Sequence, residues 1–117
     1  MAALTEEQSM IRDQARSWVS EQAPVNAFRK MRDDSVPNAF VPETWSAMVE
    51  MGWTGIIVPE QYGGSGLGYL TFGFVLEEIG RQLTASPLYA SSLVGASALQ
   101  LGGNETQKQE YLPKVVD

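Results

Sequence analysis

Apolar residues recur at helical spacing along most of the chain. The strongest series places five apolar side chains at i, i+3, i+4, i+7 and i+11: Phe72, Val75, Leu76, Ile79 and Leu83. A second series near the start of the chain has the same character: Ile11, Ala15, Trp18 and Val19. A stripe with this repeat lies on one face of an α-helix, so both series predict amphipathic helices.

Capping residues and prolines predict where the helices begin and end. Thr5 followed by Gln8 forms a capping box, which marks the start of the first helix. Pro24 ends that helix, because the residue before a proline is pushed out of the helical region. Pro42 suits the first position of a later helix, and Gly52 suits its end, since glycine readily takes the left-handed conformation there.

Two further segments have weaker or interrupted helical patterns. Residues 25–41 predict no more than a short helix and a loop. Near the end of the chain, Asn104 and Gln107 form a second capping box. Pro113 lies inside the helical pattern that follows and is expected to end or kink it.

The long break in this helical pattern is the glycine-rich stretch 52–68, which holds six of the eleven glycines. Its short apolar run at 56–58 is the one strand-like segment of the chain. The stretch is interpreted as a connector between two helices. The alternative is a phosphate-binding loop at 64–68, but the third glycine of a dinucleotide fingerprint comes one residue early and no Walker lysine follows.

The helix predicted after Ser86 and Pro87 has an unusually slim surface. Small side chains cover much of it: Ala90, Ser91, Ser92, Gly95, Ala96, Ser97 and Ala98. Its apolar contacts are expected from the larger residues: Leu88, Leu93, Val94, Leu99 and Leu101. Small residues permit close packing between helices, or they leave room for a ligand beside the helix.

These elements predict an all-α fold of five to six helices, arranged as a bundle-like single domain over residues 1–117 with one long Gly-rich loop. The composition supports a folded core, with 44% hydrophobic and 19% charged residues. The net charge of −6 argues against a nucleic-acid partner. No apolar run approaches the length of a membrane span, and no signal peptide is recognisable.

The absence of cysteine and histidine excludes thiolate nucleophiles, Cys/His zinc sites and imidazole acid–base catalysis. Glu77 and Glu78 are neighbours on a helix and point about 100° apart, so they cannot share a proton or metal as facing carboxylates do. They are expected on a solvated face, one of them paired with Arg81. No catalytic residue and no metal ligand is predicted in the chain.

Several short motifs resemble, in order and spacing, the N-terminal helical domain of the acyl-CoA dehydrogenase family. They span nearly the whole chain: LTEEQ at 4–8, RD at 12–13, Trp45, MGWTG at 51–55, VPEQYGG at 58–64, GLG at 66–68, EEIGR at 77–81, QK at 107–108 and YLP at 111–113. The resemblance implies an FAD-dependent α,β-dehydrogenation of an acyl-CoA thioester. It also implies electron transfer to an electron-transfer flavoprotein and a homo-oligomeric full-length enzyme.

In the family, a β-domain and a C-terminal helical bundle follow this domain, bind most of the FAD and supply the catalytic base. The chain reaches only Asp117, so it is expected to be inactive by itself and to hold no cofactor-binding residues. The resemblance assigns it part of the acyl-chain pocket. Four residues at i, i+3, i+4 and i+7 are the candidates for substrate binding: Leu88, Ser91, Ser92 and Gly95.

Two function classes stay open at this point. One is a domain of a flavin enzyme, located in a bacterial cytoplasm or a mitochondrial matrix. The other is a non-catalytic helical partner subunit or interaction module that keeps the same fold for assembly. The small residues of the pocket candidates favour a long or bulky acyl group in the first case.

Overall fold

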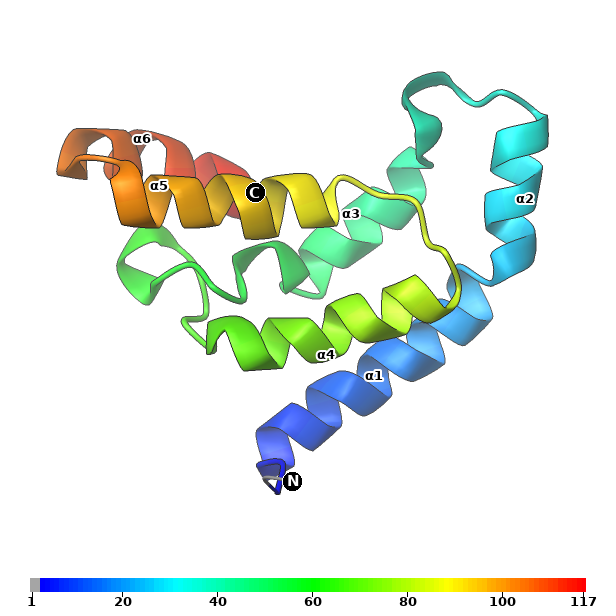
Figure 1. The fold of residues 1–117 in the computed structure, drawn as a ribbon, viewed down its shortest axis with the longest axis horizontal. Helices are drawn as coiled ribbons and strands as arrows, with labels where there is room; N and C mark the ends of the chain where they lie inside the picture. Colours follow the sequence, from blue (N-terminus) through cyan, green and yellow to red (C-terminus); the bar gives the residue numbers. More distant parts are fainter. Residues whose placement is uncertain (1–2) are drawn as a thin grey trace.

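A computed structural model describes residues 3–117 of the chain (Figure 1). The α-helices in these residues are α1 (Glu6–Gln22), α2 (Val25–Asp33), α3 (Pro42–Glu50), α4 (Gly68–Arg81), α5 (Ala96–Gly102) and α6 (Glu105–Val116). Three 3₁₀ turns and one π-helical segment complete the order: Pro37–Ala39, Trp53–Gly55, Glu60–Tyr62 and Tyr89–Gly95. The described residues contain no β-strand, which confirms the all-α prediction.

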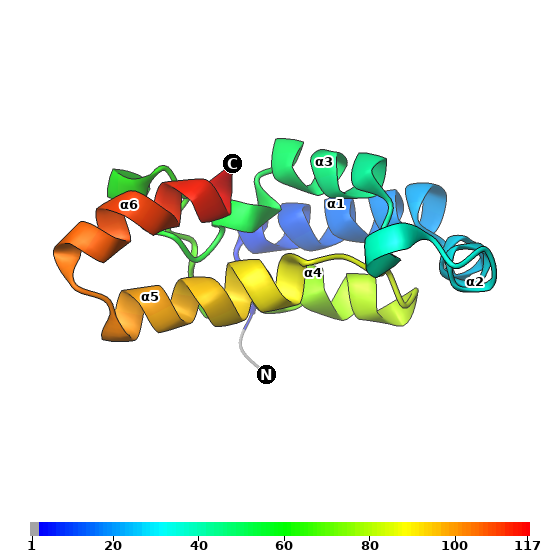
Figure 2. The same cartoon turned by 90° about the horizontal axis from the view of Figure 1, so that it is seen from above.

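The molecule is flat, with extents of 43 × 37 × 22 Å. Seen edge on, α4 and α5 lie on one side and α3 and α6 on the other (Figure 2). Helices α1 and α4 pack at an acute angle, with the beginning of α1 diverging from α4 (Figure 1), and form the most extensive contact between two elements. The buried residues of both predicted apolar stripes lie on these helices: Ala15 and Val19 on α1, and Phe72, Val75 and Ile79 on α4.

The predicted helix starts are confirmed at both capping boxes. The Gln8 amide donates to the Thr5 hydroxyl at 3.1 Å, and the Gln107 amide donates to the Asn104 side chain at 2.9 Å. In both boxes the glutamine side chain accepts in return from the backbone of the capping residue. Gly52, with φ of +75°, follows the end of α3 in the left-handed conformation expected of it.

Two details of the helix ends differ from the sequence prediction. Helix α4 stops at Arg81, so Leu83 lies outside the stripe and is 55% exposed. A Schellman motif causes this: Leu83 has φ of +55°, and the Thr84 amide donates to the Ile79 carbonyl at 3.0 Å. Helix α6 does not end at Pro113 but continues to Val116.

Pro113 cannot donate a backbone hydrogen bond within α6. Contacts with other parts of the chain stabilise the last turn of α6 and compensate for this missing bond. Leu112 is fully buried, and the Val116 carbonyl accepts a 2.6 Å hydrogen bond from the Thr54 hydroxyl. At the other end of α6, the hydroxyl of Tyr62 in the next 3₁₀ turn bonds Glu105 at 2.8 Å. This bond raises the pKa of Tyr62 above its ordinary value, because it stabilises the protonated hydroxyl beside a carboxylate.

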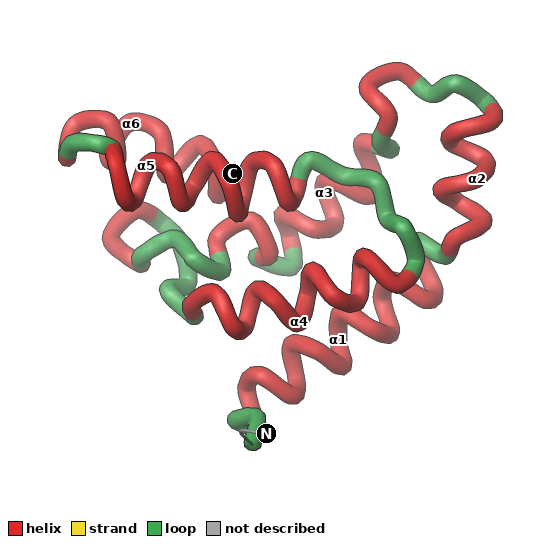
Figure 3. The backbone as a smooth tube through the Cα atoms, viewed as in Figure 1, coloured by secondary structure: helices red, strands yellow, loops and turns green. Residues whose placement is uncertain are grey.

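The glycine-rich stretch connects α3 to α4 as expected, but it is also part of the core. All six residues from 53 to 58 are buried (Figure 3 shows the short helical turns and loops of this region). The run at 56–58 is a turn rather than a strand, since the Val58 amide donates back to the Gly55 carbonyl at 3.1 Å. Residues 65–67 then return along it, and Leu67 donates to the Ile56 carbonyl at 2.8 Å.

Candidate functional site

The small-residue helix begins where the sequence predicts and runs from Leu88 through the π-helical segment Tyr89–Gly95 into α5. The Ser86 hydroxyl accepts from the Leu88 amide at 3.3 Å, and the Ser91 amide donates to the Pro87 carbonyl at 2.9 Å. These bonds confirm Ser86 and Pro87 as the start of the helix. The π conformation is the feature that spacing did not reveal.

A π-helical turn closes hydrogen bonds between residues five apart and holds more residues than an α-turn. Positions four apart therefore lie in slightly different directions within Tyr89–Gly95. A Cβ atom placed on Gly95 would meet the Ala90 carbonyl oxygen at 3.4 Å, an ordinary contact. Gly95 is thus not required for packing inside its own helix.

The four pocket candidates lie on this segment but divide into two pairs. Leu88 and Ser92 are completely buried and continue into Ala96, so this line of residues faces the interior of the described chain. Ser91 and Gly95 are half-buried and lie at the edge of the helix surface. The Ser92 hydroxyl has no hydrogen-bond partner among the described residues.

Large apolar side chains are exposed near this helix. Val94 and Leu101, which the sequence placed among its packing residues, are 50% and 85% exposed, so that prediction is wrong. Tyr89 on the same helix and Tyr69 and Leu70 at the start of α4 are exposed as well. The Tyr69 hydroxyl lies 2.8 Å from the Ser97 hydroxyl oxygen, which joins the beginning of α4 to α5.

The acidic pair on α4 is not uniformly solvated. Glu77 is exposed and bonds Arg81 at 2.6 Å, as expected, but Glu78 is only 4% exposed. The Glu78 carboxylate accepts from Arg16 of α1 at 2.8 Å and lies 3.6 Å from the Arg81 Nε atom. The hydrogen bond to Glu78 raises the pKa of Arg16, and the carboxylate charge acts in the same direction.

Glu78 therefore links α1 to α4, and Arg16 is its ion-pair partner, which the sequence did not identify. The signal was indirect: Arg16 directly follows buried Ala15, and Glu78 directly precedes buried Ile79. Charges at the edges of two facing apolar stripes can meet when the helices pack. Nothing in the periodicity, however, says that residues 62 apart are neighbours.

Removing Arg16 is expected to destabilise the fold more than removing the charge of Glu78. Arg16→Met leaves a buried carboxylate whose only remaining cation is Arg81, 3.6 Å away, whereas Glu78→Gln leaves Arg16, which is 54% exposed and can be hydrated. Urea unfolding midpoints test this order. Arg12→Met is the control on the same helix, because Arg12 pairs with the exposed Asp13. A midpoint for Arg16→Met no lower than the control would contradict the role of Glu78.

The described residues form no group of three or more acidic side chains that could hold a metal ion. None of their helices has both the length and the apolar character needed to cross a membrane. Within the glycine-rich stretch, Gly64 packs directly against the Val58 backbone. The one buried carboxylate is occupied by arginines.

Comparison with known proteins agrees with this geometry. Residues 5–117 match the family model described as "Acyl-CoA dehydrogenase, N-terminal domain". The chain is 38% identical over 115 residues to a mitochondrial isovaleryl-CoA dehydrogenase of Pongo abelii, covering 97% of this chain and 27% of that protein. It is 35% identical to the (2S)-methylsuccinyl-CoA dehydrogenase of Cereibacter sphaeroides, covering 97% of this chain and 20% of that protein.

A bacterial relative extends the range of similarity. The probable acyl-CoA dehydrogenase YngJ of Bacillus subtilis (strain 168) is 33% identical, covering 93% of this chain and 28% of that protein. In all three relatives the matched part is between 20% and 28% of the full length. The chain belongs to the acyl-CoA dehydrogenase family, and it corresponds to the N-terminal domain of that family.

Proposed function

We propose that these 117 residues form a single helical domain of an FAD-dependent acyl-CoA dehydrogenase that acts on an acyl-CoA thioester. The observation that carries this proposal is the match to the family's N-terminal domain over residues 5–117. The whole reaction removes two hydrogens from adjacent carbons of the acyl chain. The domain contributes no proton acceptor to it, so the 117 residues are expected to be inactive alone.

The domain's role in this proposal is to supply part of the acyl-chain pocket. Ser91 and Gly95, which are half-buried at the helix surface, would contact the acyl chain. Leu88 and Ser92, which are completely buried, would support that wall from behind. The exposed apolar residues Tyr89 and Val94 on the same segment favour an apolar ligand or neighbouring domain over water at this surface.

The flavin and the remaining partners would be bound by other parts of the enzyme. Gly64 packs against the Val58 backbone, so its amide region is occupied by the chain itself. The family relationship supports FAD held between a β-domain and a C-terminal helical bundle. It also supports an electron-transfer flavoprotein as acceptor, a homo-oligomeric enzyme, and a location in a bacterial cytoplasm or a mitochondrial matrix.

Gly95→Phe tests the pocket in the enzyme that contains this domain. The ring would occupy space beside the helix, so kcat/KM for long-chain acyl-CoA should fall about ten-fold or more, while short-chain substrates change little. The measurement is reduction of an artificial electron acceptor across a series of straight-chain acyl-CoAs. Gly95→Ala is the control, since its Cβ meets the Ala90 oxygen at an ordinary 3.4 Å.

Two outcomes separate the pocket proposal from the dehydrogenase proposal. Equal losses at all chain lengths would remove Gly95 from the pocket and leave the dehydrogenase proposal standing. A wild-type protein that purifies without flavin and reduces no acceptor with any acyl-CoA would contradict the enzyme and favour the non-catalytic module.

A further inference from the structure

Among the α-helices of the described chain, α2 alone makes no extensive contact with another helix or turn. Figure 1 shows it extending along the edge of the molecule, beyond the ends of α1 and α3. Within α2, Met31 is the one buried residue, and Phe28 is half-buried. Segments with little buried apolar surface open at lower free energy than the core.

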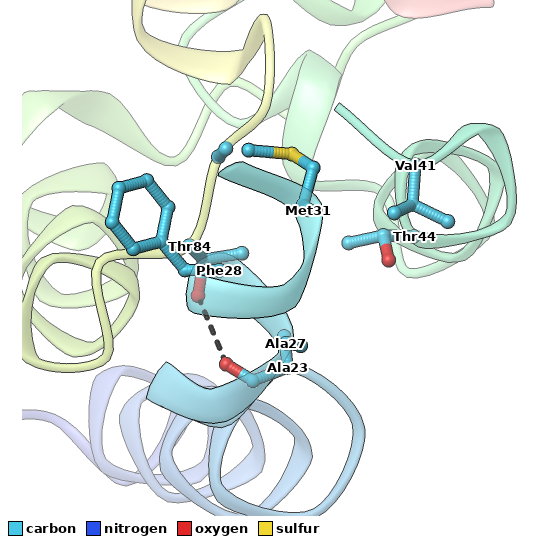
Figure 4. Close-up of a pocket in the computed structure, with 8 residues that line it drawn as sticks. Ala23, Ala27, Phe28, Met31, Val41, Thr44 and Thr84 are labelled. Carbon is cyan, nitrogen blue, oxygen red and sulfur yellow. Dashed lines mark hydrogen bonds between the residues drawn. The ribbon is translucent and has the colours of Figure 1, made fainter. Parts of the chain in front are cut away.

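The space beneath α2 is not fully packed. A small cavity of about 30 Å³ separates it from its neighbours (Figure 4). Its lining comes from α2, the end of α1, the start of α3 and the segment after α4: Ala23, Ala27, Phe28, Met31, Val41, Thr44, Thr84 and Ala85. A second, more open recess of about 210 Å³ also touches Ala27, Met31 and Val41. Both openings reach solvent, so the side chains of α2 that border them make no contact across them and do little to hold α2 in place.

The chain that follows α2 is strained. Three non-glycine residues between α2 and α3 have positive φ angles: Ser35 at +51°, Asn38 at +65° and Ala39 at +57°. The left-handed region costs an L-residue roughly 1–2 kcal/mol, and asparagine tolerates it best. Ser35 closes α2 in a Schellman motif, with the Val36 amide donating to the Met31 carbonyl at 3.2 Å. Ala39 therefore favours release of this segment, because an opened chain can return to ordinary angles.

The polar contacts of α2 with the rest of the molecule lie near its beginning. The Val25 amide donates to the Gln82 side chain at 3.1 Å. The Thr84 hydroxyl donates to the Ala23 carbonyl at 3.4 Å, a long bond drawn in Figure 4. Helix α2 starts after Pro24, with no side-chain cap. The beginning of α2 is thus suited to act as a hinge, and the Met31 end is the part that can detach.

We propose that residues 24–41 form a flap that opens cooperatively, losing the helical hydrogen bonds of α2, while α1, α3, α4, α5 and α6 stay folded. Opening withdraws Met31 and Phe28 and exposes the apolar lining at Ala23 and Ala85. Opening of the flap does not involve the proposed acyl pocket. That pocket lies on the helix that begins at Leu88, beyond the residues Thr84 and Ala85 that line the flap cavity.

Hydrogen exchange on the 117-residue chain tests the flap. Backbone amides within α2 should share one opening equilibrium and exchange at least ten-fold faster than buried amides of α1 and α4. Met31→Ala should speed the α2 amides further by ten-fold or more. Ile79→Val in α4 should speed the α1 and α4 amides and leave α2 unchanged, because Ile79 stays buried when the flap opens.

The opposite pattern overturns the proposal. If Ile79→Val speeds α2 as much as α4, then α2 opens only when the whole chain unfolds. Thiol labelling gives an independent readout, since the chain has no cysteine. Ala23→Cys places a thiol in the flap cavity, and Ala15→Cys places one in the core of the same helix. The first should react at least ten-fold faster, and equal rates would likewise contradict the flap.

Discussion

Gly64→Ala is expected to destabilise the fold by about 3 kcal/mol or more, a large share of the stability of a typical domain. A Cβ atom at this position would overlap the carbonyl oxygen of Val58. That oxygen cannot move freely, because Val58 is fully buried and its carbonyl accepts a 2.9 Å hydrogen bond from Gly66. The Gly64 Cα also lies only 3.2 Å from where a Cβ on Gly55 would be.

The measurement is chemical unfolding of the two glycine variants beside the wild type. Gly73→Ala is the control: Gly73 lies inside α4, and a Cβ there meets nothing within 4 Å. The free energy of unfolding of Gly73→Ala should rise by about 1 kcal/mol, the usual preference of a helix for alanine over glycine. A Gly64→Ala protein within about 0.5 kcal/mol of wild type, the usual range for harmless surface changes, would show that the loop can separate from Val58.

The helices were predictable because their signals are local. Thr5 with Gln8 and Asn104 with Gln107 lie three residues apart, and their capping bonds form within one turn. The apolar stripes of α1 and α4 also needed no knowledge of the partner helix. Predictions failed where a distant contact decides the outcome, as at the end of α6, where Thr54 and buried Leu112 keep the turn beyond Pro113 helical.

The candidate site was predictable only as a segment. Small residues identified the helix after Ser86, but which of its side chains are buried depends on the tertiary structure. Within the π-helical segment Tyr89–Gly95, Ser92 is fully buried and Val94 is half-exposed. Likewise, the pairing of Glu78 with Arg16 joins two helices whose relative position no sequence period encodes.

Trp53→Ala is expected to lower the free energy of unfolding by about 3–5 kcal/mol, as when other large aromatic residues are removed from a core. Trp53 lies in the glycine-rich stretch, is 1% exposed, and packs edge-to-face on Trp18 of α1 with ring centroids 5.3 Å apart. Urea unfolding measures the loss. Trp45→Ala is the control: Trp45 is only half-buried, so its removal should lower the free energy of unfolding by less. Equal costs would mean that the stretch acts only as a connector between α3 and α4.

Trp53→Phe separates the shape of the ring from its polar group. The indole Nε1 of Trp53 has no hydrogen-bond partner among the described residues, so phenylalanine loses no bond in the folded state. The loss should therefore be well below that of Trp53→Ala. A double-mutant cycle of Trp53→Ala with Trp18→Leu should give a coupling of about 0.5–1.5 kcal/mol, the range of aromatic pairs. A coupling near zero would place the contribution of Trp53 in general burial, since its contact with Trp18 would then add nothing specific.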